Sequence, residues 1–245
     1  GEAPEPLPID AAVLAADATR EWVVTAQGRR LLPEANTPQG RVIRRALGIT
    51  PDTPRWSPPT QVISAVQELP PAALPDPLPQ IIDADDASWA LLNGRIQPIT
   101  ATQRTMLLDA GAKAAVAARE SLATYPDADE ELRLPGERPR WIEPHLACVD
   151  QGRGGATVAE APEGIALSGT SVATYFAGLH GGSVGVDSGH GFHVVSANGL
   201  RHRAPDAETL ATVGAAHVED VPWEIVALLP EGAELTRDSA LQATY

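Results

Sequence analysis

Three stretches of the chain share one pattern of apolar and polar positions. Each opens with an aromatic residue and a short apolar run, reaches a two-residue turn, and continues with an arginine and a second short run. Because Asn-Gly accepts the positive φ angles of a tight hairpin turn, the pattern predicts three β-hairpins. The stretches are residues 22–48, 89–111 and 192–214. Their turn dipeptides are Gln27-Gly28, Asn93-Gly94 and Asn198-Gly199.

A short helix is predicted after each hairpin. A proline follows the second run, and apolar residues then recur three and four positions apart, as at Val42, Ile43, Ala46 and Leu47. Each helical segment ends in a glycine that suits a left-handed C-cap. The prolines are Pro33, Pro98 and Pro205, and the glycines are Gly48, Gly111 and Gly214. One hairpin with one short helix cannot bury its own apolar face, so the sequence predicts an α+β repeat protein.

The stretches between the hairpins differ in composition. The start, "GEAPEPLPID", is rich in proline and is predicted to be a linker, as is the polar and Pro-rich stretch before residue 145. The stretch that opens with "HLACVDQGRGGATVAEAP" is predicted to contain a buried strand. The predicted division is a linker 1–19, repeat units 20–80 and 81–119, a linker 120–144, a central β segment 145–188 and a C-terminal repeat unit 189–245.

Composition excludes some partners and leaves others. The 245 residues are 43% hydrophobic, which fits a globular protein, and they carry a formal net charge of −14. An acidic surface repels phosphate backbones and anionic lipid, so nucleic-acid binding is not expected. The local basic run "GRVIRRALG" is interpreted as a solvated helix face. No apolar run approaches the length of a membrane-spanning helix, no signal peptide opens the chain, and the single cysteine, Cys148, permits no internal disulfide.

The residues do not converge on a catalytic or metal site. Four histidines cluster in one region with Asp187 nearby, but no HExxH motif accompanies them and they fall on Gly-rich loops and strands. Strand alternation places His193 opposite Phe192, facing solvent or a neighbouring repeat. The single lysine, Lys113, is not in a P-loop, and no GxSxG elbow is present. We therefore expect no metal and no cofactor. The four histidines are His180, His190, His193 and His202.

Residues 189–241 resemble the C-terminal repeat of EccB, the membrane-anchored core component of actinobacterial type VII secretion systems. The family's turn is matched by Ser196–Arg201 with Pro205, and its helix end by Val213-Gly214. Residues 22–49 and 89–111 are similar to earlier repeats of the family, in the same order. The family's Leu-Pro element is matched by Val221, Pro222, Leu228, Leu229, Pro230, Gly232 and Leu235.

The resemblance implies an elongated extracytoplasmic (periplasmic) domain, with repeats arranged around a central β segment as a distorted propeller. It implies a structural role in which the domain contacts other copies of itself and other secretion core components. Membrane attachment would run through an anchor absent from this chain, so we expect a soluble fragment that lacks the family's N-terminal part. The cysteine that pairs with Cys148 in the family is also absent.

Two other functions stay open beside assembly. Family members are sometimes labelled ATPases, so nucleotide hydrolysis is one alternative, and a module that binds cell-wall glycan is the other. For the assembly role, three groups of residues are singled out. The turn glycines are Gly28, Gly94 and Gly199; the arginines expected to contact other repeats are Arg29, Arg95 and Arg201; the residues expected to pack the repeat are Trp223, Leu228, Leu229 and Pro230.

Overall fold

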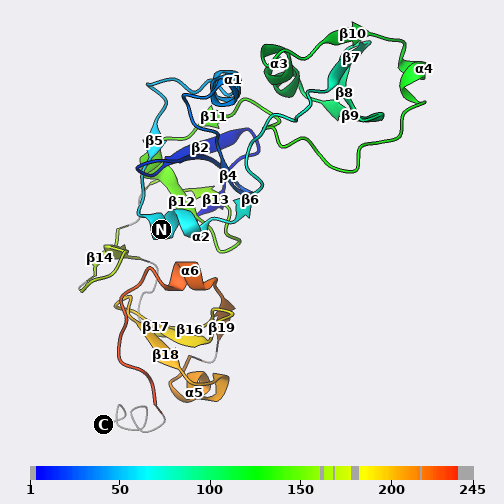
Figure 1. Ribbon diagram of the computed structural model, residues 1–245. Coiled ribbons are helices and arrows are strands. Elements are labelled where there is room, and N and C mark those ends of the chain that lie inside the picture. The colour runs from blue at the N-terminus through cyan, green and yellow to red at the C-terminus, as the bar shows by residue number, and fades with distance from the viewer. Residues whose placement is uncertain (1–3, 161–162, 168, 178–181, 216, 237–245) are drawn as a thin grey trace. The chain divides into compact units, whose positions relative to one another are not determined.

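The structure is a computed structural model, and it describes every residue except 1–3, 161–162, 168, 178–181, 216 and 237–245 (Figure 1). The chain divides into two compact units, each assembled from segments that are separate in sequence. The first unit consists of Gly1–Leu7, Ser57–Gln67 and His145–Tyr245, and the second of Pro8–Trp56 and Glu68–Pro144. The ends of the predicted segments 1–19 and 189–245 lie partly outside the described residues.

Three repeats share one order of elements: a first strand, a hairpin, a helix, and a last strand that runs parallel to the first. The first repeat consists of β2 (Ala11–Ala16), β3 (Glu21–Thr25), β4 (Gly28–Leu31), α1 (Pro38–Ala46) and β5 (Arg55–Trp56). The second consists of β7 (Gln80–Ala84), β8 (Ala87–Leu92), β9 (Arg95–Ile99), α3 (Ala101–Asp109) and β10 (Ala114–Val116). The third consists of β16 (Ser183–Asp187), β17 (Phe192–Ser196), β18 (Arg201–Ala204), α5 (Ala207–Thr212) and β19 (Val218–Asp220). The predicted hairpins and helices are confirmed, as is the α+β class, but each repeat also has an outer strand at both ends.

Local chemistry sets the turns and the helix ends. Gly28, Gly94 and Gly199 have φ angles of 144°, 75° and 72°, as the hairpin turns require. The capping glycines, Gly48, Gly111 and Gly214, have φ angles of 67°, 104° and 80°. Beyond each of them, the next N–H donates to the carbonyl five residues back at 2.9 Å, which is a Schellman motif. Thr37, Thr100 and Asp206 cap the helix starts, each accepting the N–H three residues on.

The alanine-rich strand β2 lies at the heart of the second unit. All six of its residues are buried, and its sheet has the order β11-β2-β3-β4-β6, with β5 also paired to β2. The added strands are β11 (Arg140–Trp141) and β6 (Glu68–Leu69). The prediction that residues 1–19 form a linker is therefore wrong. Alanine lacks the β-branched signature of a strand, but its small side chain packs closely in the middle of a sheet.

The predicted linker 120–144 is extended but not loose. It carries the end of helix α4 (Arg119–Leu122) and three side chains that are less than a tenth exposed, Leu122, Leu134 and Ile142. Leu134 joins a core cluster that also contains Leu14, Ile43 and Met106. Spaced apolar residues in this polar stretch anchor it to the second unit, so the description as a linker is corrected.

The third repeat and the central strands belong to the first unit. β12 (Ala147–Val149) and β13 (Gly155–Thr157) form a hairpin that pairs with β1 (Glu5–Pro6). The two-stranded hairpin of β14 (Ile165–Ala166) and β15 (Tyr175–Phe176) follows. β16, predicted to lie in the central segment, instead pairs with β17 and β19. The boundary predicted at residues 188 and 189 therefore cuts through the sheet of the third repeat.

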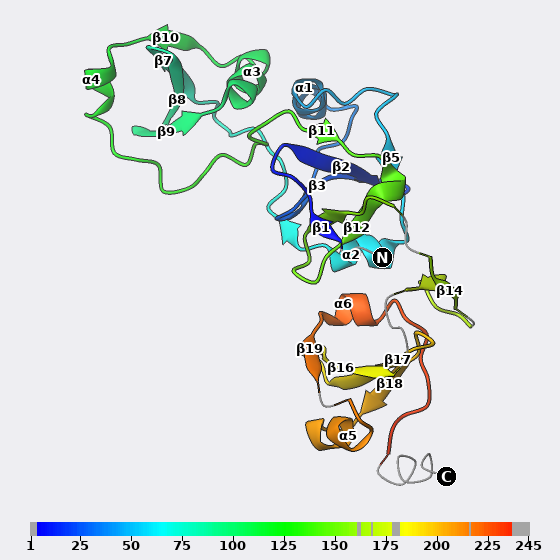
Figure 2. The same cartoon turned by 180° about the vertical axis from the view of Figure 1, so that it is seen from behind.

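Helices cover both sides of the third sheet. In Figures 1 and 2, α5 lies on one side of β16–β18, and α6 (Trp223–Val226) lies on the other. Adjacent residues of β17 point to these opposite sides, since Val194 packs in a cluster with Leu210 and Val195 packs in one with Val226. Helix α6 also packs against α2 (Thr60–Ala65), which the chain supplies from far upstream.

No helix in the described part of the chain combines the length and the apolar character that crossing a bilayer requires.

Candidate functional site

Each repeat is closed by a later segment that pairs in parallel with the return strand of its hairpin. In the first repeat β6 pairs with β4, matching Arg29 with Glu68. In the second repeat Ile96 forms a bridge to Asp127, and in the third Arg201 forms one to Glu231. The sequence pattern of proline, apolar run and Leu-Pro marks two of these closures, whereas the closure of the second repeat falls in the stretch predicted to be a linker.

The arginine that follows each turn holds this closing segment. Arg29 Nη2 lies 3.1 Å from Glu68 Oε2, and Arg201 Nη2 lies 3.1 Å from Glu231 Oε2. Arg95 Nη1 donates to the Asp127 carbonyl at 2.8 Å. The side chains of Arg29 and Arg201 are 14% exposed and that of Arg95 is 44% exposed, so two closures are more desolvated than the third. These contacts join each repeat to its own closing segment, and the expectation that the arginines contact other repeats stays a prediction.

The predicted packing residues of the third repeat surround Arg201. Its guanidinium lies 5.0 Å from the centre of the Trp223 ring, and its Nε donates to the Leu229 carbonyl at 3.1 Å. Its backbone N–H donates to the carbonyl of the buried Pro230 at 3.0 Å. The Leu228 carbonyl accepts the N–H of Ala173 at 2.9 Å. All four predicted residues thus pack or bond inside the first unit.

His193, expected to face solvent or a neighbouring repeat, is buried. Its side chain is 4% exposed, and its ring lies 5.4 Å from that of Trp223, centre to centre. Opposite faces for Phe192 and His193 were expected correctly, but α6 covers the face that was taken to be open. Burial, together with the charges of Arg201 and Arg203, lowers the pKa of His193, so the neutral ring is favoured.

The other histidines are separate from it. His202 Nδ1 lies 2.9 Å from the Ala233 carbonyl, and His190 Nδ1 lies 3.5 Å from the Ser188 carbonyl. His180 lies outside the described residues. Over the part of the chain that the structure describes, no three His, Cys, Asp or Glu side chains come together to hold a metal ion.

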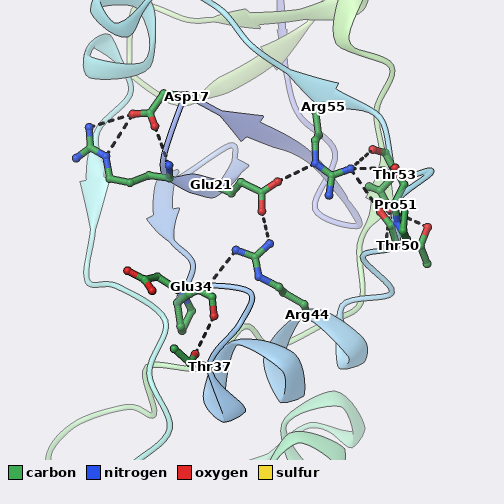
Figure 3. Close-up of polar contacts among 11 residues, drawn as sticks. Asp17, Glu21, Glu34, Thr37, Arg44, Thr50, Pro51, Thr53 and Arg55 are labelled. Atoms are coloured by element: carbon green, nitrogen blue, oxygen red, sulfur yellow. Dashed lines mark hydrogen bonds and ion pairs between the residues drawn. The ribbon is translucent and has the colours of Figure 1, made fainter.

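A buried ion-pair cluster in the first repeat was missed by sequence reasoning. Glu21 accepts hydrogen bonds from Arg44 and from Arg55 Nε, the latter at 2.8 Å, and joins β3 to α1 and β5 (Figure 3). Burial raises the pKa of Glu21, but the bonds from Arg55 and Arg44 outweigh it and the net pKa is lowered. Arg44 is 9% exposed, so the basic run is not wholly a solvated face. Arg41 and Arg45, which flank Arg44 on the helix, are the more exposed members of that run.

Comparisons with known proteins agree with this architecture. Residues 151–244 match the sequence model of the family described as "Type VII secretion system ESX-1, transport TM domain B". Two curated relatives, both named "ESX-1 secretion system ATPase EccB1" and from Mycobacterium tuberculosis strains CDC 1551 / Oshkosh and ATCC 25618 / H37Rv, are 39% identical over 49 residues. The C-terminal part of the chain is thus similar to the EccB family. The match to these two EccB proteins covers 20% of this chain and 10% of their own length.

Chains of solved ESX complexes have the same fold along nearly the whole chain. The EccB3 dimer from the ESX-3 core complex superposes with a TM-score of 0.72 at 19% identity, covering 98% of this chain and 75% of that one. The periplasmic assembly from the ESX-5 inner membrane complex gives a TM-score of 0.66 at 18% identity, covering 98% and 72%. An intact ESX-5 inner membrane complex gives 0.69 at 18% identity, covering 98% of this chain and 60% of that one.

Cys148 is a free, half-buried thiol. Burial and the nearby Asp150 carboxylate raise the pKa of Cys148 to about 11. Because the thiolate is the nucleophilic form, this cysteine is a poor nucleophile at neutral pH.

The Gly-rich turn beside Cys148 is used structurally. Asp150 accepts the N–H of Gly154 at 2.8 Å, and Arg153 Nε donates to the Ala65 carbonyl at 3.0 Å. Backbone and side-chain donors here bind the protein itself, so the turn holds the segment that carries α2.

Several large apolar side chains are exposed. Val116 on the edge strand β10 is 87% exposed, and Tyr175 on the β14–β15 hairpin is 68% exposed. Contiguous exposed apolar patches mark protein–protein interfaces, whereas single exposed residues such as these are ordinary on a protein surface. The described residues thus form repeats that are closed by their own ion pairs and that expose a few single apolar side chains.

Proposed function

We propose that this chain is the periplasmic part of a type VII secretion membrane-complex component and acts in assembling and stabilising that complex. The single observation that carries the proposal is the likeness of fold to the EccB assemblies over 98% of the chain. Its partners would be further copies of itself and other core components of the complex, on the outer side of the cell membrane. Repeats closed by their own ion pairs suit this role, because they hold a rigid surface for partners.

The experiment is a native-gel analysis of membrane complexes from cells that make the anchored protein. One variant lacks residues 20–241, and a second carries Val116→Asp and Tyr175→Asp, which place charge on exposed positions without disturbing the core. We expect the deletion to abolish the large complex and the double variant to weaken it. Glu143→Gln, an exposed polar exchange, is the matched control and leaves the complex unchanged. An intact, secreting complex in the deletion variant would overturn the proposal.

The proposal extends to the arrangement of the repeats. We take the repeats to form an elongated, distorted propeller-like domain around a central β segment, as the family resemblance implies. Small-angle X-ray scattering of the chain measures its maximum dimension and its radius of gyration. Values typical of a compact sphere of this mass would contradict an elongated domain.

Nucleotide hydrolysis is a second candidate, favoured by the name of the two curated relatives. Among the described residues, Lys113 directly precedes the edge strand β10, and its carbonyl accepts the N–H of Ile81 at 2.8 Å, so it lies in no phosphate-binding loop. Phosphate release from ATP with Mg²⁺ by the purified chain tests it, and turnover lost in a Lys113→Met variant would support it. Retention on purified peptidoglycan tests the cell-wall alternative in the same way.

A further inference from the structure

A groove of about 510 Å³ opens in the second unit. Its apolar lining includes Ala12, Val23 and Leu47, which come from the sheet and helix of the first repeat. Pro98 on β9 and the irregular segment of residues 131–139 line it as well. The volume lies within the range of about 300–1,000 Å³ that is typical of ligand sites.

An unusually exposed apolar side chain borders this groove. Ile9 is 97% exposed, more than any other large hydrophobic residue in the described part of the chain. Leaving a side chain of that size in water costs free energy, which burial against a partner recovers. A hollow beside an exposed isoleucine therefore points to an occupant with an apolar group of its own.

The charged groups of the groove define the rest of the occupant. Arg30 lines it and donates through Nη1 to the Pro70 carbonyl at 2.7 Å. A guanidinium has five donors, and over the described residues the Arg30 side chain shows this one hydrogen bond. Three carboxylates also line the groove, those of Asp10, Glu131 and Glu137. Asp10 forms an ion pair with Arg140 at 3.5 Å, and the charge of Glu131 acts on Arg30. Arg30 with Glu131 and Glu137 therefore leaves a net negative site that contains a donor.

We propose that the groove binds an extended segment of a partner polypeptide that carries an arginine or a lysine. A main-chain carbonyl of the segment accepts from Arg30, its basic side chain pairs with Glu131 and Glu137, and an apolar side chain packs on Ile9. The proline-lined wall cannot donate backbone N–H groups at Pro98, Pro135 and Pro139, so recognition rests on these side chains. This site is additional to the assembly role and does not depend on it.

The test measures binding of two fluorescein-labelled octapeptides to the 245-residue chain by fluorescence anisotropy. One peptide alternates alanine with arginine, and the other alternates alanine with glutamate. We expect the arginine peptide to bind at least about tenfold more tightly. The double variant Glu131→Gln/Glu137→Gln should weaken its binding about twofold to thirtyfold, because each exposed charge pair contributes about 0.2–1 kcal/mol.

The control separates the groove from the overall acidity of the chain. Glu120→Gln/Glu143→Gln makes the same change in net charge at exposed positions outside the groove, and it should leave binding unchanged. Ile9→Ser should weaken binding without lowering the melting temperature, since the side chain is exposed. Equal weakening by both double variants, or equal binding of the two peptides, would overturn the inference. Native gels report complex assembly and this titration reports peptide binding, so each proposal can fail alone.

Discussion

Glu21 gives a quantitative test of how the first repeat is held together. It bonds Arg44, whose side chain is 11% exposed, and Arg55, whose side chain is 34% exposed. Replacing Glu21 with leucine leaves the Arg44 guanidinium buried, with its bond to the Pro33 carbonyl at 3.0 Å still in place. Removing one partner of a buried ion pair costs about 3–5 kcal/mol. Loss of the pair with the more exposed Arg55 adds less than about 1 kcal/mol, so the expected loss of stability stays about 3–5 kcal/mol.

We therefore expect Glu21→Leu to lower the free energy of unfolding by about 3–5 kcal/mol. For a chain of this size, each kcal/mol lowers the melting temperature by about 2–4 °C, so the expected fall is roughly 6–20 °C. Circular dichroism followed during heating, and urea titration at 25 °C, measure the two quantities.

The matched control is Asp109→Leu, which removes a carboxylate from an exposed pair with Arg45 at 3.9 Å. Asp109→Leu should lower the free energy of unfolding by less than about 1 kcal/mol. The double variant Glu21→Leu/Arg44→Met should regain most of the lost stability, because apolar residues can replace a buried ion pair at little cost. If Glu21→Leu costs no more than Asp109→Leu, or if the double variant is as unstable as the single one, the reasoning is refuted.

Three further predictions concern single residues. Arg201→Met should lower the free energy of unfolding, measured in urea, by about 2–3 kcal/mol, and Arg95→Met should lower it by less than about 1 kcal/mol. The difference is expected because the Arg201 side chain is far less exposed than that of Arg95. Equal losses in the two variants would contradict this. Hydrogen bonds from Arg104 and Ser88 lower the pKa of Asp83 to about 2, so its contribution is present above the unfolded pKa of 3.8 and is lost as pH falls toward 2. In the Asp83→Asn variant, the urea midpoint should therefore change less with pH between about 3.8 and 2 than it does in the unmodified chain. The same pH dependence in both proteins would count against this prediction. The pKa of His193 is lowered by burial, so stability should fall as pH drops below about 6.5, and His193→Phe should remove that part of the fall between about pH 7 and pH 5.

The features that the sequence predicted well are those encoded within a few residues. A positive φ angle at Gly94 or Gly214 depends on the absence of a side chain at that position, and the Thr100 cap depends on a hydroxyl three residues from its donor. Such signals need no knowledge of what lies across the fold. They gave the hairpins, the helices and the order of the repeats.

The missed features depend on contacts between residues distant in sequence. The last strand of each repeat has two or three residues, and the segment that closes it has two residues or forms a single bridge, too few to show a period. Arg44 lies in a run of arginines, and nothing local indicates that Glu21, 23 positions earlier, pairs with it. His193 was placed on the correct side of its strand, but the helix that covers that side comes 30 residues later, at Trp223. In each case the deciding partner came from another element.

The split composition of the first unit sets an order in which the chain can fold. The second unit draws all its segments from residues 8–144, so it can form once that much of the chain has been made. By then α2 and β1 have also been made, but their partners α6 and β13 are still to come. Two early segments must therefore wait, unpaired, for the last hundred residues. A chain that stops at residue 144 would keep one finished unit and two orphan segments, which a protease would cut first.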